Sequence, residues 1–122
     1  MSETPVRKVY SGVKLDPGQG GPIPVYVSVF RSGEKIASSI YPLKHIVRHS
    51  PSGFQWGYNG SGPSDLALAV LADLIGLEAA SERGFYIDFR RRFVAPAGQV
   101  FRVDELDVWA WIDEVMREGD RP

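Results

Sequence analysis

Residues Pro63–Gly76 read PSDLALAVLADLIG, and this stretch decides the fold class of the chain. Between Leu66 and Ile75 the single charged residue is Asp73, so a helix here would be apolar on nearly all sides. Such a helix is normally buried at the centre of a domain. We therefore expect the rest of the chain to be folded around it.

The two ends of this helix carry boundary signals. Pro63 suits the first turn, and Ser61 or Gly62 can cap it. The negative charge of Asp65 favours the positive end of the helix dipole. At the other end, Gly76 supplies a left-handed stop.

The first half of the chain predicts strands. Apolar residues alternate in Val9–Val13 and in Val25–Phe30, which is typical of strands with one buried face. Arg31–Glu34 is a turn, Lys35–Tyr41 is the expected hairpin partner, and Leu43–Val47 is a further short strand. Connections this short join antiparallel strands.

The second half predicts two more helices. Aromatic residues three and four apart indicate a helix over Glu78–Val94 that begins late or kinks at Gly84. A last helix is capped by Asp104 and stopped by Gly119. Its apolar face is formed by Val108, Trp109, Ile112, Val115 and Met116.

These elements predict a single α+β domain over residues 1–122. A small antiparallel sheet from the N-terminal half would pack against about three α-helices from the C-terminal half. Residues 1–6 and 119–122 are expected to fray at the two ends.

The charge of the chain is nearly balanced but unevenly distributed. The formal net charge is −1. Residues 1–63 carry seven Lys/Arg and three Asp/Glu, residues 64–103 carry five of each, and residues 104–122 carry two and seven, which gives +4, 0 and −5. A nearly neutral domain is a poor general binder of nucleic acid, so nucleic acid is not the partner that we expect.

Composition also excludes several kinds of site. The chain has no cysteine, which excludes disulfides and thiolate chemistry and is consistent with a cytoplasmic location. Its longest apolar run, Leu66–Ala72, is too short to span a bilayer, so we expect no membrane contact. On a strand, His45 and His49 would lie roughly 13 Å apart. Without a third ligand, we expect no metal site and no cofactor.

The most unusual stretch is the glycine-rich segment Gly53–Ser64, which leads into the apolar helix. Free N–H groups at a helix start can hold a phosphate or carboxylate. The candidate ligand-binding residues are His49, Tyr58, Asn59, Gly60, Ser61 and Gly62. Against this reading, Pro63 removes one donor and Asp65 adds a negative charge nearby. A tight structural turn that buries Phe54 and Trp56 explains the same residues, and we favour it.

Three residues are candidates for contact with a protein partner, namely Arg90, Arg91 and Trp111. The arginines close the second helix, where positive charge is stabilising by itself. Trp111 lies at the edge of the apolar stripe, either as a lid over the core rim, which we favour, or as an exposed contact. No set of side chains predicts a catalytic site.

Residues 49–76, HSPSGFQWGYNGSGPSDLALAVLADLIG, carry a resemblance to known proteins. The block S-P-x-G-F-x-W-G-Y-x-G-S-G-P at Ser50–Pro63 is followed by Tyr-x-x-Phe at Tyr86–Phe89 and a Trp/Ile helix at Trp109–Ile112. In these features the chain resembles a family of short bacterial proteins classed as a domain of unknown function, whose members also occur on phages and plasmids. The resemblance implies one domain and supplies no activity.

Three functional hypotheses follow, of which the third is the weakest. The first is a non-enzymatic binding or accessory protein, in the setting of a mobile element or of anti-defence, that acts through a protein partner or a second copy of itself. The alternative is a protein or enzyme that binds a small phosphate- or carboxylate-bearing ligand at the glycine-rich loop. Nucleic-acid binding by the basic first half is a third reading.

Overall fold

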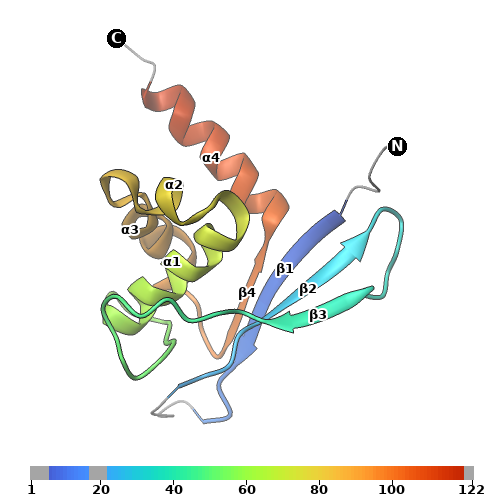
Figure 1. Cartoon of the computed structure of the whole chain (residues 1–122), viewed down its shortest axis with the longest axis horizontal. Coiled ribbons are helices and arrows are strands. Elements are labelled where there is room, and N and C mark those ends of the chain that lie inside the picture. The colour runs from blue at the N-terminus through green and yellow to red at the C-terminus, as the bar shows by residue number, and fades with distance from the viewer. Residues whose placement is uncertain (1–5, 17–21, 120–122) are drawn as a thin grey trace.

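The computed structural model describes residues 6–16 and 22–119, and it has the α+β fold that the sequence predicts. Four strands form one antiparallel sheet in the order β3-β2-β1-β4 (Figure 1). They are β1 (Val6–Val13), β2 (Tyr26–Arg31), β3 (Ser39–Pro42) and β4 (Val100–Asp104). Of the ends predicted to fray, Val6 belongs to β1 and Gly119 to the last helix, and the other residues lie outside the described ranges.

Strand β4 is the element that the sequence did not predict, and it brings a segment of the C-terminal half into the sheet. It pairs antiparallel with β1, with Val103 opposite Tyr10. Phe101 and Val103 are buried, whereas Val100 and Arg102 are exposed, which is the alternation of a half-buried strand. The helix-capping signal at Asp104 comes directly after this short alternation and is stronger, so the sequence predicts the helix here and no strand.

The hairpin between β2 and β3 is confirmed, but its second strand is shorter than the predicted Lys35–Tyr41. Ile36 is 84% exposed, so no packing extends the strand toward the turn. The predicted strand Leu43–Val47 is wrong. The N–H of Leu43 still donates to the carbonyl of Val25 at 2.8 Å, but the chain then leaves the sheet.

Helix α1 (Ser61–Ile75) is the buried centre of the fold, as predicted. Every residue from Gly62 to Leu71 is buried. The helix packs against α2 (Leu77–Ser81) and α3 (Phe85–Phe89), and these three helices lie on one side of the sheet (Figure 1). Gly76 ends α1 as predicted, but its φ of 91° and ψ of 153° are not the left-handed helical conformation that was expected.

The single helix predicted over Glu78–Val94 is wrong, because the structure divides this segment into short pieces. A 3₁₀ turn (Glu82–Gly84) separates α2 from α3, and a π-helical turn (Arg90–Val94) follows α3. Arg83 and Gly84 have φ values of 52° and 69°. Two successive residues with left-handed backbone break the helix at the glycine where a kink was expected.

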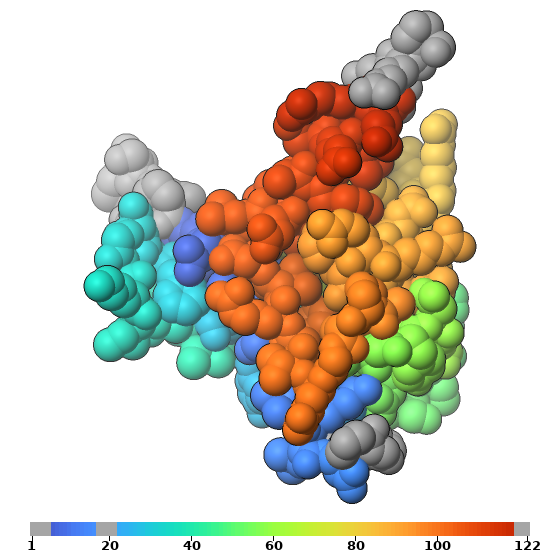
Figure 2. All heavy atoms as spheres, turned by 180° about the vertical axis from the view of Figure 1, so that it is seen from behind, coloured from blue at the N-terminus to red at the C-terminus, as the bar shows by residue number. Residues whose placement is uncertain are grey.

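Helix α4 (Glu105–Gly119) follows β4 directly, and its C-terminal end projects beyond the other helices (Figures 1 and 2). The predicted cap is confirmed, because the N–H of Leu106 donates to Oδ1 of Asp104 at 3.0 Å. This hydrogen bond satisfies one of the free donors of the first turn.

Trp111, and not Trp109, faces the core from α4. Trp111 is 9% exposed, which confirms the predicted position at the core rim, whereas Trp109 is 42% exposed. The indole of Trp111 stacks on Phe85 with ring centroids 5.1 Å apart. It meets Phe89 and Phe93 edge-on at 5.8 and 5.7 Å. The apolar face of α4 is therefore rotated from the one that the sequence predicts.

Candidate functional site

The glycine-rich segment packs against the core at the start of α1, as the structural reading predicts. Trp56 is fully buried and Phe54 is 5% exposed. The indole N–H of Trp56 donates to the carbonyl of Gly98 at 2.7 Å, and the N–H of Gly57 donates to the carbonyl of Val94 at 3.1 Å. Much of the segment is therefore used to build the fold.

Close packing explains two of its glycines. Gly53 has a φ of 103°, and a Cβ there would lie 2.6 Å from the Cβ of Pro22. A Cβ on Gly62, in the first turn of α1, would lie 2.8 Å from the Cβ of Gln55. Larger residues would collide at both positions, so these glycines are required whether or not a ligand binds.

Asp65 anchors the segment that precedes the glycine-rich loop, a role that the sequence did not reveal. Its carboxylate is fully buried. It accepts hydrogen bonds from the backbone N–H groups of Arg48, His49 and Ser50 at 3.3, 2.9 and 3.0 Å. The Nε2 atom of His45 lies 2.9 Å from the same carboxylate.

These donors keep Asp65 ionised. Burial alone would raise the pKa of the Asp65 carboxyl, but the hydrogen bonds from His45 and from the three N–H groups outweigh burial and lower its pKa. The negative charge is thus satisfied by the preceding segment. It opposes an anion at the start of α1 less than the sequence suggests.

Arg90 joins two groups of predicted residues. Its Nε donates to Oδ1 of Asn59 at 3.0 Å, and its Nη1 donates to the hydroxyl oxygen of Ser64 at 2.8 Å. The hydroxyl of Ser64 in turn donates to the carbonyl of Gly60 at 2.6 Å. Arg90 was predicted to contact a partner, yet it lies beside two of the predicted ligand-binding residues.

The other predicted ligand-binding residues are more dispersed. The Nε2 atom of His49 lies 2.7 Å from the hydroxyl of Tyr86 on α3, so its hydrogen-bond partner is not Tyr58 or Asn59. Tyr58 is 51% exposed, and Ser61 is also exposed. The structure therefore brings Arg90, Asn59 and Gly60 together and leaves His49 in a separate contact.

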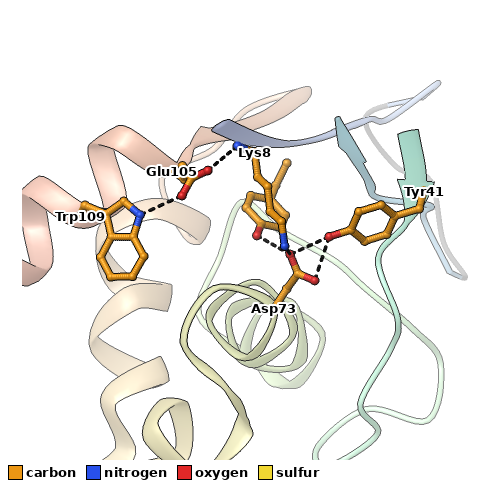
Figure 3. A network of polar contacts seen from close by, with 6 residues as sticks. Lys8, Tyr41, Asp73, Glu105 and Trp109 are labelled. Carbon is orange, nitrogen blue, oxygen red and sulfur yellow. Dashed lines mark hydrogen bonds and ion pairs between the residues drawn. The ribbon is translucent and has the colours of Figure 1, made fainter. Parts of the chain in front are cut away.

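A second polar cluster ties the other end of α1 to the sheet (Figure 3). Asp73 accepts hydrogen bonds from the hydroxyls of Tyr10 and Tyr41 at 2.5 and 3.0 Å, and from Nζ of Lys8 at 3.1 Å. In the sequence, Asp73 is only the one charge in an apolar helix. Its partners come from β1 and β3, so no local pattern could have found them.

The polar contacts of this cluster suit a tether between α1 and the sheet. Burial and the hydrogen bond to Asp73 raise the pKa of both Tyr10 and Tyr41. Burial acts to lower the pKa of Lys8, but the hydrogen bonds to Tyr41 and Asp73 outweigh it and raise that pKa. The tyrosines keep their protons and the lysine keeps its charge near neutral pH, where a general base must be able to take up a proton.

An apolar groove lies between α4 and the segment of α2 and α3, and we call it the α3–α4 groove. Its volume is about 610 Å³. Its large apolar side chains are Ile75, Phe85, Trp109, Ile112, Val115 and Met116, and its charged ones are Glu82, Arg83 and Asp88. Met116 is 60% exposed, so its predicted place on the core face of α4 is wrong, like that of Trp109.

Two contacts define the surroundings of this groove. The indole N–H of Trp109 donates to Glu105 at 2.8 Å, and Glu105 also accepts the backbone N–H of Lys8 at 2.5 Å (Figure 3). On the opposite wall, the guanidinium of Arg91 lies 3.9 Å from Asp88. Of the three predicted partner contacts, Arg91 is the one that is exposed and adjacent to the groove.

Within residues 6–16 and 22–119, no group of three or more His, Asp or Glu side chains is placed to hold a metal ion. The two histidines have separate partners, because His45 contacts Asp65 and His49 contacts Tyr86. The same part of the chain contains no helix that is both long and apolar enough to cross a membrane.

A family model matches most of the chain. No curated protein and no solved structure gives a match. The matching model is described as a family of unknown function (DUF6166), and it covers residues 21–114, from the segment before β2 into the second half of α4. The chain therefore belongs to the DUF6166 family.

Proposed function

We propose that this protein is a non-enzymatic binding protein that acts through a protein partner, and that the partner docks in the α3–α4 groove. The observation that carries the proposal is the exposure of two large apolar side chains there, Trp109 at 42% and Met116 at 60%. Contiguous apolar surface of this kind marks interaction sites on folded proteins.

The composition of the groove suits an amphipathic helix of the partner. Such a helix binds by laying an apolar stripe, with anchors three and four residues apart, into a groove of this kind. Methionine adapts its shape to a partner, and tryptophan supplies a large contact area. The hydrogen bond from Trp109 to Glu105 holds the indole in place before binding, which lowers the entropic cost of association.

We propose that the protein acts in the bacterial cytoplasm as an accessory factor of a mobile element. The most specific version of this proposal is that it counteracts a host defence system. The absence of cysteine and the resemblance to proteins of phages and plasmids support this setting. Expression of the wild-type chain should restore phage growth in a host that carries the relevant defence system, and expression of Met116→Asp should not. Failure of the wild-type chain to restore phage growth would remove this setting, whereas restoration by both proteins would remove the role of the groove in it.

Two aspartate substitutions on α4 test the groove itself. Met116 and Leu106 are almost equally exposed, at 60% and 59%, but Met116 lines the groove and Leu106 does not. Wild type and Leu106→Asp should retrieve the same partner from bacterial lysate. Met116→Asp should retrieve it at least about tenfold less well, the loss expected for one interface anchor. Equal capture by the two variants, or no partner at all, would contradict the proposal.

The position of Arg90 favours a second candidate function, the binding of a phosphate- or carboxylate-bearing ligand at the start of α1. Its guanidinium lies beside Asn59 and Ser64, at the positive end of a 15-residue helix. Inorganic phosphate and pyrophosphate should raise the thermal stability of the wild type. The same gain should occur in the exposed control Arg92→Gln but not in Arg90→Gln. Equal responses of the two variants would remove this candidate.

A further inference from the structure

The sheet has a second face, which none of the described helices covers (Figure 1). Tyr10, Val27 and Phe101 point toward the helices and are fully buried. Because side chains alternate along a strand, Val13 and the residues on its side of the sheet point away from the helices. We call this second side the open face, and its exposed apolar residues come from all four strands.

The open face is more apolar than its position requires. An antiparallel sheet with one face in solvent usually carries polar side chains on that face. Here Val13 and Val100 form a cross-strand pair and are 52% and 55% exposed. Tyr26 on β2 and Ile40 on β3 are 46% and 64% exposed. These four side chains are exposed apolar residues of this face, whereas Val9, which points to the same side, is 5% exposed.

The charged residues of the open face can complement those of an identical surface. Arg7 lies 3.5 Å from Asp104. Arg102 is exposed and has no ion-pair partner within the residues that the structure describes. Arg102 and Asp104 are two residues apart on β4 and therefore point to the same side. Oδ1 of Asp104 accepts the N–H of Leu106, Oδ2 lies near Arg7, and the side chain is 14% exposed, so a second arginine would use the remaining lone pairs of the carboxylate.

We infer that the open face binds the open face of a second copy of this chain in a two-fold symmetric dimer. A two-fold axis that crosses the strands at the level of Tyr10 and Val103, which are opposite in register, brings Arg102 of each copy to Asp104 of the other. The same axis places every strand over its own counterpart, so both sheets overlap along their width. Face-to-face sheets pack about 10 Å apart, with interdigitated side chains.

The charges also argue against a head-to-tail arrangement. The helical side of a second copy presents α4, whose residues carry five Asp/Glu and one Arg. Against the open face, most of this negative charge would find no cation, because Arg7 already contacts Asp104 and, among the residues that the structure describes, Arg102 alone is left to pair with it. A contact that uses the same patch on both copies also closes the assembly, whereas a head-to-tail contact can extend into fibres.

Sedimentation equilibrium of the full chain, from micromolar to millimolar concentration, tests the inference. Wild type should be a dimer at the upper end of this range. Ile40→Lys and Arg102→Glu should each raise the dissociation constant at least about tenfold, because each places a charge where it meets apolar surface or Asp104 of the second copy. Ile36→Lys is the matched control, since Ile36 is 84% exposed on the same hairpin but outside the strands.

Each outcome decides the matter. A wild type that stays monomeric throughout the range overturns the inference, and so does a dimer that both variants leave intact. A dimer lost in Met116→Asp, but kept in both sheet variants, would assign the contact to the α3–α4 groove instead. Circular dichroism checks that the variants are folded. If Ile40→Lys does not fold, Arg102→Glu decides alone.

Discussion

Helix α1 carries a carboxylate near each end, and the two are used in different ways. Asp65 is fully buried and accepts hydrogen bonds mainly from backbone N–H groups of a segment without regular secondary structure. The side chain of Asp73 is 21% exposed and accepts hydrogen bonds from side chains of the sheet. Side chains can turn toward water when their partner is lost, but backbone donors are fixed by the path of the chain. Asp65 should therefore be the harder of the two to replace.

The largest effect is expected for Asp65→Ala. The substitution leaves the N–H groups of His49 and Ser50 without their acceptor and removes the partner of His45. Breaking a buried charged network of this kind costs about 3–5 kcal/mol of unfolding free energy. Urea denaturation followed by tryptophan fluorescence measures it.

The control for this experiment is an exposed ion pair. Asp113 pairs with Arg117 on the surface of α4, with both side chains more than half exposed. Asp113→Ala should therefore change the unfolding free energy by less than about 1 kcal/mol. If Asp65→Ala lowered the unfolding free energy no more than this control, the segment before the glycine-rich loop would keep its position without the Asp65 carboxylate.

The next largest effect is expected at acid pH, where the contacts of Asp65 should contribute less to the unfolding free energy. The hydrogen bonds lower the pKa of Asp65 in the folded protein, whereas its unfolded value is about 3.9. The stabilisation is therefore complete above the unfolded pKa, and it is lost as the pH falls through the folded pKa. Unfolding free energy measured from neutral to strongly acid pH should show this decline. It should be flatter in Asp65→Asn, and an unchanged slope would assign the acid sensitivity to other carboxylates.

A smaller loss is expected for Asp73→Ala. Lys8 and Tyr41 are partly exposed and can turn to water, but Tyr10 is fully buried and its hydroxyl loses its acceptor. One unsatisfied buried hydroxyl, with the loss of a partly exposed ion pair, costs about 2 kcal/mol. The same urea measurement applies. A cost above that of Asp65→Ala would reverse the comparison.

The same contrast explains what the sequence could reveal. The burial of α1 was predictable because its apolar residues are contiguous, and the Asp104 cap because it is local. The partners of Asp65 are 15 to 20 residues away, and Lys8 is 65 residues from Asp73. Contacts at such separations depend on the fold and leave no local pattern.

The candidate surfaces follow the same rule. Arg90 was recognised, but its place at the glycine-rich loop depends on the break in the helix at Gly84. The exposure of Trp109 depends on the orientation of α4 about its own axis. The spacing of apolar residues predicts this orientation only approximately. The most distinctive sequence block therefore packs largely into the fold, whereas the exposed apolar surfaces carry little sequence signal.

Among the substitutions in the Asp65 and Asp73 clusters, Tyr41→Phe should have the smallest effect, and its pH dependence distinguishes the two ends of α1. The substitution removes one partly exposed hydroxyl from the Asp73 cluster and should cost about 1 kcal/mol at neutral pH. Burial and Asp73 raise the pKa of Tyr41 in the folded protein above its unfolded value of about 10. Its stabilisation is thus complete below the unfolded pKa, and it is lost as the pH rises through the folded one. The alkaline decline of unfolding free energy should therefore be shallower in Tyr41→Phe, while the acid decline set by Asp65 should stay unchanged. If the substitution altered the acid side as well, the two carboxylates would be coupled through α1, and the two ends of the helix would have to be treated as one site.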